Sequence, residues 1–173
     1  QALEHLIMAG PLSPTELARR LGVAVGERAR TPDVRAAVLE LRRGKGMVLD
    51  AADPDTRSAG SFFTNPLLDA REAAAFRARV LERCGPDVVA PGWLGDDGRL
   101  KVSAAWLIER SGFGKGHFAG PVGISSKHAL ALVHRGGGTT AELLAVARAI
   151  RDGVREAFGV ELVNEPVLVG DVL

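Results

Sequence analysis

The feature that most limits how this chain can fold is an amphipathic helix predicted over residues 139–159. Thr139 and Glu142 have the spacing of a capping box at its start, and Gly159 is suited to end it. Between these ends, apolar residues recur at helical spacing along one stripe: Leu143, Ala147, Ile150, Val154 and Phe158. A helix with one apolar stripe is stable when that stripe covers another layer, so the chain must supply a second layer.

Weaker patterns predict four more helices and several short strands. Proline, capping and glycine signals predict helices over 13–21, 31–44 and 103–110, with Thr31 as the cap of the second and Gly44 just past its end. Apolar residues on one helical face predict a further helix over 69–84. Apolar runs predict strands over 58–68, 122–124, 129–133, 160–163 and 166–169, and the Gly-, Pro- and Asp-rich segment 85–99 is expected to be mostly loop. We therefore expect an α+β fold, with a small sheet and helices packed on it, and one domain over 1–173.

Composition argues against several classes of protein. Lys and Arg total 22 against 21 Asp and Glu, and this near-neutral balance argues against a nucleic-acid partner. Cys84 is the single cysteine, so no internal disulfide can form, and we expect a reducing, cytoplasmic location. No apolar run reaches the roughly 18 residues that span a bilayer, and no His, Cys and Asp group has metal-ligand spacing. We therefore expect neither a membrane partner nor a metal.

Segment 58–66 carries the most informative chemistry. If it is extended, Ser61, Phe63 and Asn65 share one face, so a hydroxyl and an amide point the same way beside Gly60, which permits close approach of a ligand. The pattern alone favours a simpler interpretation, in which this is a sheet strand whose serine and asparagine satisfy local backbone groups.

Segment 58–66 contains one of five short sequence motifs that occur in a fixed order along the chain. Residues 59–66 read Ala-Gly-Ser-Phe-Phe-Thr-Asn-Pro. The other motifs are Leu-Arg-Arg-Gly-Lys at 41–45, Ala-Ala-Trp-Leu-Ile-Glu at 104–109 with the glycines that follow it, Lys-His-Ala-Leu at 127–130, and Gly-Val-Glu-Leu-Val-Asn-Glu-Pro-Val at 159–167. In order and spacing, residues 14–170 resemble the C-terminal, substrate-binding half of the UDP-N-acetylenolpyruvoylglucosamine reductases.

The resemblance implies an oxidoreductase of peptidoglycan synthesis. The family converts UDP-N-acetylenolpyruvoylglucosamine to UDP-N-acetylmuramate: NADPH reduces FAD, a hydride passes to the vinyl carbon, and a proton reaches the adjacent carbon. The implied cofactors are thus FAD and NADPH, and the implied partners are the nucleotide-sugar substrate and a flavin-binding domain. That domain lies upstream in the family and is absent from this chain, so the isolated chain is expected to be inactive.

The same resemblance implies roles for individual residues. Ser61 matches the proton donor, and Glu165 matches the glutamate that polarises or protonates the enolpyruvyl group. Lys45 and Asn65 match positions that contact the nucleotide diphosphate, where a lysine supplies a point charge for phosphate. His128 matches a polar residue near the same phosphates. From residue type alone, Glu165 would be a solvated turn residue and His128 a partly buried structural histidine.

Two departures from the family pattern stand out. Many relatives place a tyrosine over the diphosphate near the start of this half, whereas this chain contains no tyrosine and reads Ser-Pro-Thr over 13–15. The second departure is that the family's flavin-binding half is absent, and the glycines at 112, 114 and 116 do not replace it, because they do not follow a predicted strand and open a helix as a dinucleotide-binding loop requires.

No signal peptide opens the chain. It begins at Gln1 without a methionine, which we interpret as a fragment, a processed chain or a chain whose start has been omitted.

Two other interpretations remain open. Residues 2–22 resemble the opening of a winged helix-turn-helix DNA-binding module, but such a module needs a recognition helix almost immediately after Gly22, and 23–31 carries a break instead. Alternatively, the chain is a stand-alone, non-catalytic domain that binds a UDP-sugar or contributes an interface. The presence of an upstream flavin domain in the same gene would distinguish this from a half-enzyme.

Overall fold

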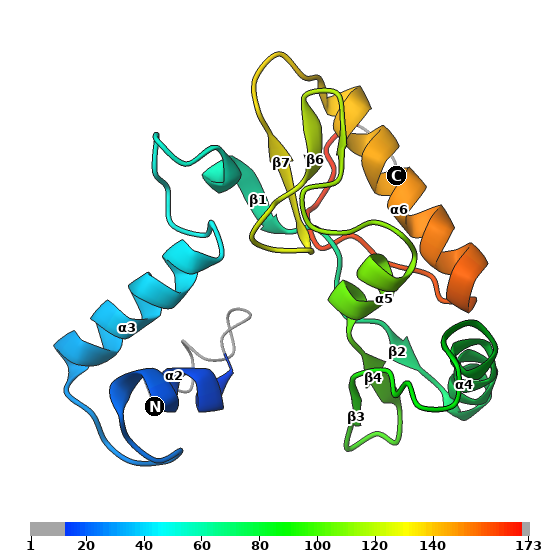
Figure 1. The fold of residues 1–173 in the computed structure, drawn as a ribbon, viewed down its shortest axis with the longest axis horizontal. Coiled ribbons are helices and arrows are strands. Elements are labelled where there is room, and N and C mark those ends of the chain that lie inside the picture. The colour runs from blue at the N-terminus through cyan, green and yellow to red at the C-terminus, as the bar shows by residue number, and fades with distance from the viewer. Residues whose placement is uncertain (1–12, 171–173) are drawn as a thin grey trace. The chain divides into compact units, whose positions relative to one another are not determined.

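A computed structural model describes residues 13–170 of the chain (Figure 1). The chain divides into two compact units, the first ending at Asp50 and the second beginning at Ala51. Each unit has its own cluster of buried apolar side chains. Whether the two units act as one substrate-binding domain stays a prediction. No helix in the described part of the chain is long and apolar enough to cross a membrane.

The described part of the first unit contains a pair of helices, as predicted. Ser13 caps α2 (Pro14–Leu21) by accepting the backbone N–H of Glu16 at 3.0 Å, and Gly22, with φ of 69°, ends it in the left-handed conformation. The pair packs through Leu17 of α2 and several apolar residues of α3 (Thr31–Gly44): Val34, Ala37 and Val38. Residues 2–12, which belong to the helix-turn-helix alternative, lie outside the described residues.

The predicted ends of α3 were wrong by one or two residues. Thr31 is the first helical residue and not the cap, since Arg30 occupies the cap position without a side-chain hydrogen bond. Gly44 is the last helical residue, and the left-handed glycine after the helix is Gly46, with φ of 68°. Pro32 in the first turn fixes the start of the helix whichever residue precedes it, so the error in the cap leaves the helix intact.

The second unit has the predicted α+β architecture. Its four-stranded antiparallel sheet has the order β1-β7-β6-β5, formed by β1 (Ser58–Ser61), β5 (Phe118–Ala119), β6 (Val122–Ile124) and β7 (Ala131–His134). A three-stranded antiparallel sheet has the order β2-β4-β3, formed by β2 (Leu67–Leu68), β3 (Gly92–Leu94) and β4 (Leu100–Val102). The helical elements are η1 (Pro54–Thr56), α4 (Ala70–Cys84), α5 (Ala104–Arg110) and α6 (Thr140–Phe158).

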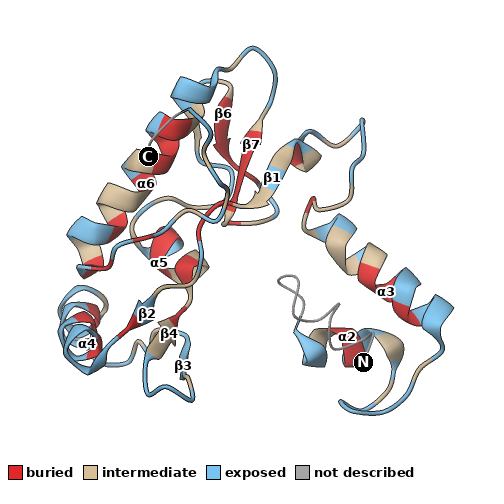
Figure 2. Cartoon of the chain, turned by 180° about the vertical axis from the view of Figure 1, so that it is seen from behind, coloured by how far each residue is buried: buried red, intermediate tan, exposed pale blue. Residues whose placement is uncertain are grey.

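The core of the second unit lies under α6, the helix predicted over 139–159. Thr139 and Glu142 form the predicted capping box, and the buried face of α6 packs on β6 and β7 (Figures 1 and 2). At the end of α6, the ring of Phe158 lies 6.1 Å from that of Phe76 on α4 and 5.4 Å from that of Trp106 on α5, measured between centroids. The three helices of this unit therefore meet at one aromatic side chain.

Three strand predictions were wrong. Residues 58–68 form two short strands in different sheets, because the chain leaves the first sheet after Ser61 and joins the second at Leu67. Residues 160–169 form one isolated bridge, at Asn164, in place of two strands. Segment 85–99 is mostly loop, as predicted, and its one short strand, β3, pairs with β4. For 58–68 and 160–169, the contacts that decide where strands form lie with segments far away along the chain.

Gly123 gives this fold a specific point of sensitivity. A Cβ at this position of β6 would lie 2.7 Å from Phe118 Cα and would also clash with the backbone oxygen of His117. We expect Gly123→Ala to lower the free energy of unfolding by about 3 kcal/mol, since overpacking against backbone is relieved only by moving β5. Urea unfolding would measure it, with Gly114→Ala as the control because an added Cβ there meets nothing within 4 Å. Equal midpoints for the two variants would contradict the close packing of β5 on β6.

Candidate functional site

Ser61 is presented at the end of β1 by a β-bulge. Ser58 pairs with Val133 and Ser61 with Ala131, so three steps along β1 match two along β7. Gly60 lies within the bulge with φ of 89°, a conformation that side chains with a Cβ rarely adopt. Bulges redirect the side chains that follow them, and this one brings Ser61 to the turn between β6 and β7.

His128, a predicted site residue in that turn, lies beside Ser61. Ser61 Oγ and His128 Nε2 lie 3.4 Å apart, at the long end of hydrogen-bond distance. Both residues are partly buried. A hydroxyl and an imidazole can each donate or accept a hydrogen bond, so the pair can exchange a hydrogen bond with either partner as donor.

Glu165 reaches the same region through backbone pairing. Phe63 and Asn164 form an antiparallel bridge, in which Thr64 donates to Val163 O at 3.0 Å and Glu165 donates its backbone N–H to Phe62 O at 2.8 Å. Glu165 therefore lies opposite the residue that follows Ser61, and it is exposed. Phe62 and Phe63 are both buried, so burial does not distinguish the two faces predicted for 61–65, and that alternation stays a prediction.

Asn65 has a structural partner. Its Oδ1 accepts the backbone N–H of Ala104 at 2.9 Å, while Ser103 Oγ accepts that of Trp106 at 3.3 Å, so the two side chains together satisfy donors at the start of α5. This is the local backbone role that the simpler interpretation of the segment gave it. A hydrogen bond from Asn65 to a phosphate oxygen would have to come from its amide NH₂ group, and that role stays a prediction.

Lys45 belongs to the first unit. It follows α3 directly, and its ammonium lies 3.0 Å from a carboxylate oxygen of Glu16 on α2. Both side chains are about a quarter exposed, so this ion pair holds the ammonium at the end of α3. Its contact with a diphosphate stays a prediction.

The sequence reasoning missed a charged cluster around Asp55 in η1. Burial by itself would raise the pKa of this carboxyl, which is 3% exposed, but hydrogen bonds from Ser126 and Arg135 outweigh burial and hold the pKa below its ordinary value. Nearby, a hydrogen bond from Lys127 lowers the pKa of Asp53. The only local signal was the Asp-Pro-Asp turn, because the partners lie more than 70 residues away along the chain.

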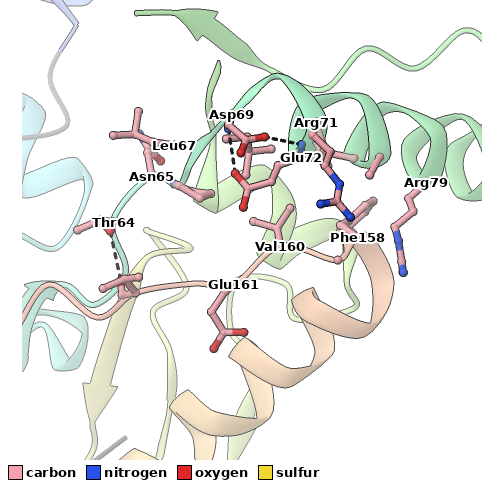
Figure 3. Close-up of a pocket in the computed structure, with 16 residues that line it drawn as sticks. Thr64, Asn65, Leu67, Asp69, Arg71, Glu72, Arg79, Phe158, Val160 and Glu161 are labelled. Atoms are coloured by element: carbon pink, nitrogen blue, oxygen red, sulfur yellow. Dashed lines mark hydrogen bonds between the residues drawn. The ribbon is translucent and has the colours of Figure 1, made fainter. Parts of the chain in front are cut away.

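A cavity of about 750 Å³ lies between the start of α4 and the segment that follows α6 (Figure 3). Of the predicted site residues, only Asn65 lines it. Its charged residues are largely engaged, since Asp69 and Glu72 form the capping box of α4 and Arg79 donates to the carbonyl of Glu156. Ser61, His128 and Glu165 do not line this cavity.

The glycine-rich loop over 111–117 does not have the form of a dinucleotide-binding loop. It leaves α5 and leads into β5, which reverses the strand–loop–helix order of such a loop. Gly116 also donates its N–H to backbone oxygens of Ile124 and Ser125, so the loop is tied to β6. Within residues 13–170, no group of His, Cys, Asp or Glu could hold a metal ion.

Comparison with known proteins decides the family. The family model for the C-terminal domain of UDP-N-acetylenolpyruvoylglucosamine reductase matches residues 53–169. The chain belongs to this family. The matched range lies within the second compact unit and contains Ser61, Asn65, His128 and Glu165, whereas Lys45 precedes it.

Individual relatives extend the likeness to the first unit. The chain is 61% identical to the UDP-N-acetylenolpyruvoylglucosamine reductase of Thermobifida fusca over 166 residues, which cover 96% of this chain and 47% of that protein. It is 58% identical to the reductase of Streptomyces avermitilis, covering 94% and 45%, and 52% identical to that of Mycolicibacterium gilvum, covering 94% and 45%. The chain thus spans about half the length of these relatives. The resemblance inferred from the five sequence motifs is confirmed.

Proposed function

We propose that this chain is the substrate-binding and proton-donating half of an enzyme that reduces UDP-N-acetylenolpyruvoylglucosamine to UDP-N-acetylmuramate. The observation that carries the proposal is the meeting of the Ser61 hydroxyl and the His128 imidazole, with the Glu165 segment paired alongside. This arrangement lies within the part of the chain that matches the family.

Ser61 is the proposed proton donor. Reduction of the enolpyruvyl double bond adds a hydride to one carbon and a proton to its neighbour, and FAD bound elsewhere in the intact protein would supply the hydride. A serine hydroxyl is a weak acid in water, so it serves only when it is positioned against a strongly basic carbon. His128, 3.4 Å from Ser61 Oγ, can hydrogen-bond the serine oxygen before and after its proton leaves.

The remaining predicted residues are proposed to bind or polarise the substrate. Glu165 would polarise or protonate the enolpyruvyl group, and its exposure leaves the carboxyl accessible to a ligand. The Lys45 ammonium would bind the negatively charged diphosphate in place of the Glu16 carboxylate that it contacts in this structure. Asn65 and His128 would contribute polar contacts to the same diphosphate.

The cofactors and setting follow from the family. We propose that FAD is held by the half of the protein that this chain lacks, that NADPH reduces it, and that the whole works in cytoplasmic peptidoglycan synthesis. This division agrees with the absence of a fitting dinucleotide loop in the described residues. The flavin-binding half is then the essential partner of this chain.

Equilibrium dialysis of the 173-residue chain tests the division of labour. We expect the chain to retain UDP-N-acetylenolpyruvoylglucosamine but to lose the visible absorbance of FAD on dialysis. Lys45→Ala should weaken retention of the nucleotide sugar by about tenfold, the effect of losing one charged hydrogen bond, whereas Lys101→Ala should not. Tight retention of FAD at one equivalent would contradict the proposal.

A further inference from the structure

The turn that carries His128, residues 125–130, is shaped internally by Ser125. The Ser125 side chain is fully buried, and its Oγ accepts the backbone N–H groups of Lys127 and His128 at 3.0 and 3.3 Å. Ser125 also donates its own N–H to Ala131 O at 2.9 Å. These bonds all lie within the hairpin of β6 and β7, so they do not by themselves set the distance between His128 and β1.

Asp55 supplies a contact that ties the turn to the chain leading into β1. Its Oδ2 accepts the backbone N–H of Ser126 at 3.2 Å and also the Ser126 hydroxyl, and its Oδ1 accepts from Arg135 Nη2 at 3.1 Å. The Arg135 guanidinium is itself placed 4.1 Å over the ring of Phe118. Ser126 precedes His128 by two residues, and Asp55 precedes Ser61 by six. Segments 55–61 and 126–128 therefore contact each other twice, once between Asp55 and Ser126 and once between Ser61 and His128.

We propose that Asp55 is a positioning residue for the Ser61–His128 pair: by holding Ser126 through its buried carboxylate, it fixes the His128 imidazole beside the Ser61 hydroxyl. The inference rests on the proposed function, because it gives Asp55 a role in a proton transfer by Ser61. It also gives a role to the buried Asp55 carboxylate, which has none in the proposed proton transfer itself.

The chemistry of the contact favours positioning over plain stabilisation. Apolar residues of similar volume stabilise a buried site as well as a buried ion pair does, because burying charge costs desolvation. A carboxylate adds directional contacts instead. Here it takes both the backbone and the hydroxyl of Ser126, which allows one orientation of the turn. A displacement of about 1 Å at a reacting group can cost about 100-fold in rate, so such a constraint bears directly on Ser61.

The variants separate positioning from a general loss of structure. Asp55→Asn keeps the shape of the side chain but places an NH₂ group against at least one of three donors. Ser126→Ala is a milder change that removes one hydroxyl contact and keeps the backbone bond. Asp53→Asn is the matched control, since it removes the ion pair with Lys127 in the same turn, while the asparagine oxygen can still accept the Asp55 N–H that Asp53 Oδ1 accepts at 3.1 Å. The contacts of Asp55 with Ser126 and Arg135 involve other atoms.

Rapid-reaction kinetics on the full-length, flavin-loaded protein give the first measurement. We expect Asp55→Asn to slow flavin reoxidation by UDP-N-acetylenolpyruvoylglucosamine about 10- to 100-fold and Ser126→Ala by a smaller factor, while flavin reduction by NADPH stays within about twofold. Asp53→Asn should leave both half-reactions within about twofold. Equal losses in both half-reactions, or no loss in Asp55→Asn, would overturn the proposal.

A double-mutant cycle tests whether Asp55 acts through His128. In a His128→Gln background, Asp55→Asn should add less than about twofold to the slowing, whereas independent effects would multiply and so refute the inference.

A readout that needs no turnover separates this inference from the proposed function. In full-length protein labelled at histidine, Asp55→Asn should shift the His128 imidazole NMR signals, identified by their loss in His128→Gln, and Asp53→Asn should not. If Ser61→Ala left flavin reoxidation unchanged, the proposed function would fail, and these signals would then decide the role of Asp55 alone. Unshifted signals in Asp55→Asn would overturn it.

Discussion

Replacing Ser61 by alanine is expected to slow the oxidation of reduced flavin by the enolpyruvyl substrate by about 10²- to 10⁴-fold. This is the range for loss of a positioned general acid. The expectation rests on the proposed function and applies to the full-length protein. Reduction of the flavin by NADPH needs no proton from Ser61, so that half-reaction should stay nearly unchanged. Stopped-flow absorbance of the flavin measures the two steps separately.

A matched serine makes this result specific. Ser58 lies on the same strand, and its Oγ accepts the backbone N–H of Gly60 at 3.3 Å, so Ser58→Ala perturbs the same bulge without removing the Ser61 hydroxyl. We expect both half-reactions of Ser58→Ala to stay close to wild type. If Ser61→Ala and Ser58→Ala slowed the reaction alike, or if Ser61→Ala slowed both half-reactions equally, the serine would have a structural role only.

The largest effect on stability is expected from Phe158→Ala. The Phe158 side chain is 1% exposed, and its ring contacts Phe76 and Trp106 and lies under the guanidinium of Arg83. Truncating a buried phenylalanine removes transfer free energy and leaves a cavity, at a cost of about 3–5 kcal/mol. Because the ring lies where α4, α5 and α6 meet, no single helix can move to fill the space.

Urea unfolding of the chain, followed by circular dichroism, measures this cost. Leu81→Ala on α4 is the control, because Leu81 is 57% exposed and its truncation should change the free energy of unfolding by no more than about 0.5 kcal/mol. A loss below about 1 kcal/mol in Phe158→Ala would mean that the three helices pack independently of this ring.

The helices were predictable because their signals are local. Caps, prolines in first turns, glycines after helices and apolar residues at helical spacing act over a few residues, and they identified α2, α4, α5 and α6 with ends correct to about one residue. The prediction failed at the end of α3, where two glycines could each follow the helix. Gly44 is still helical and Gly46 has the left-handed conformation, which only the backbone of the folded chain shows.

The candidate site was predictable in part. Family resemblance pointed to Ser61 and His128, and the fold brings the two within 3.4 Å although 67 residues separate them. The same resemblance did not reveal that Asn65 accepts the N–H of Ala104 at the start of α5 or that Lys45 pairs with Glu16. Residue type shows what a side chain can bind, but its actual partner depends on which backbone groups the fold places near it.

The sequence by itself determined the helices, the α+β class, the family and the chemical identity of the site residues, because each follows from short-range patterns or ordered motifs. Tertiary structure alone decided where strand 58–68 breaks, and that 62–64 pairs with 163–165. It alone also joined Asp55 to Ser126, 71 residues away. Such contacts form between segments that are far apart along the chain and that only folding brings together. A local sequence pattern therefore does not show which distant N–H or O–H group a carboxylate will bind.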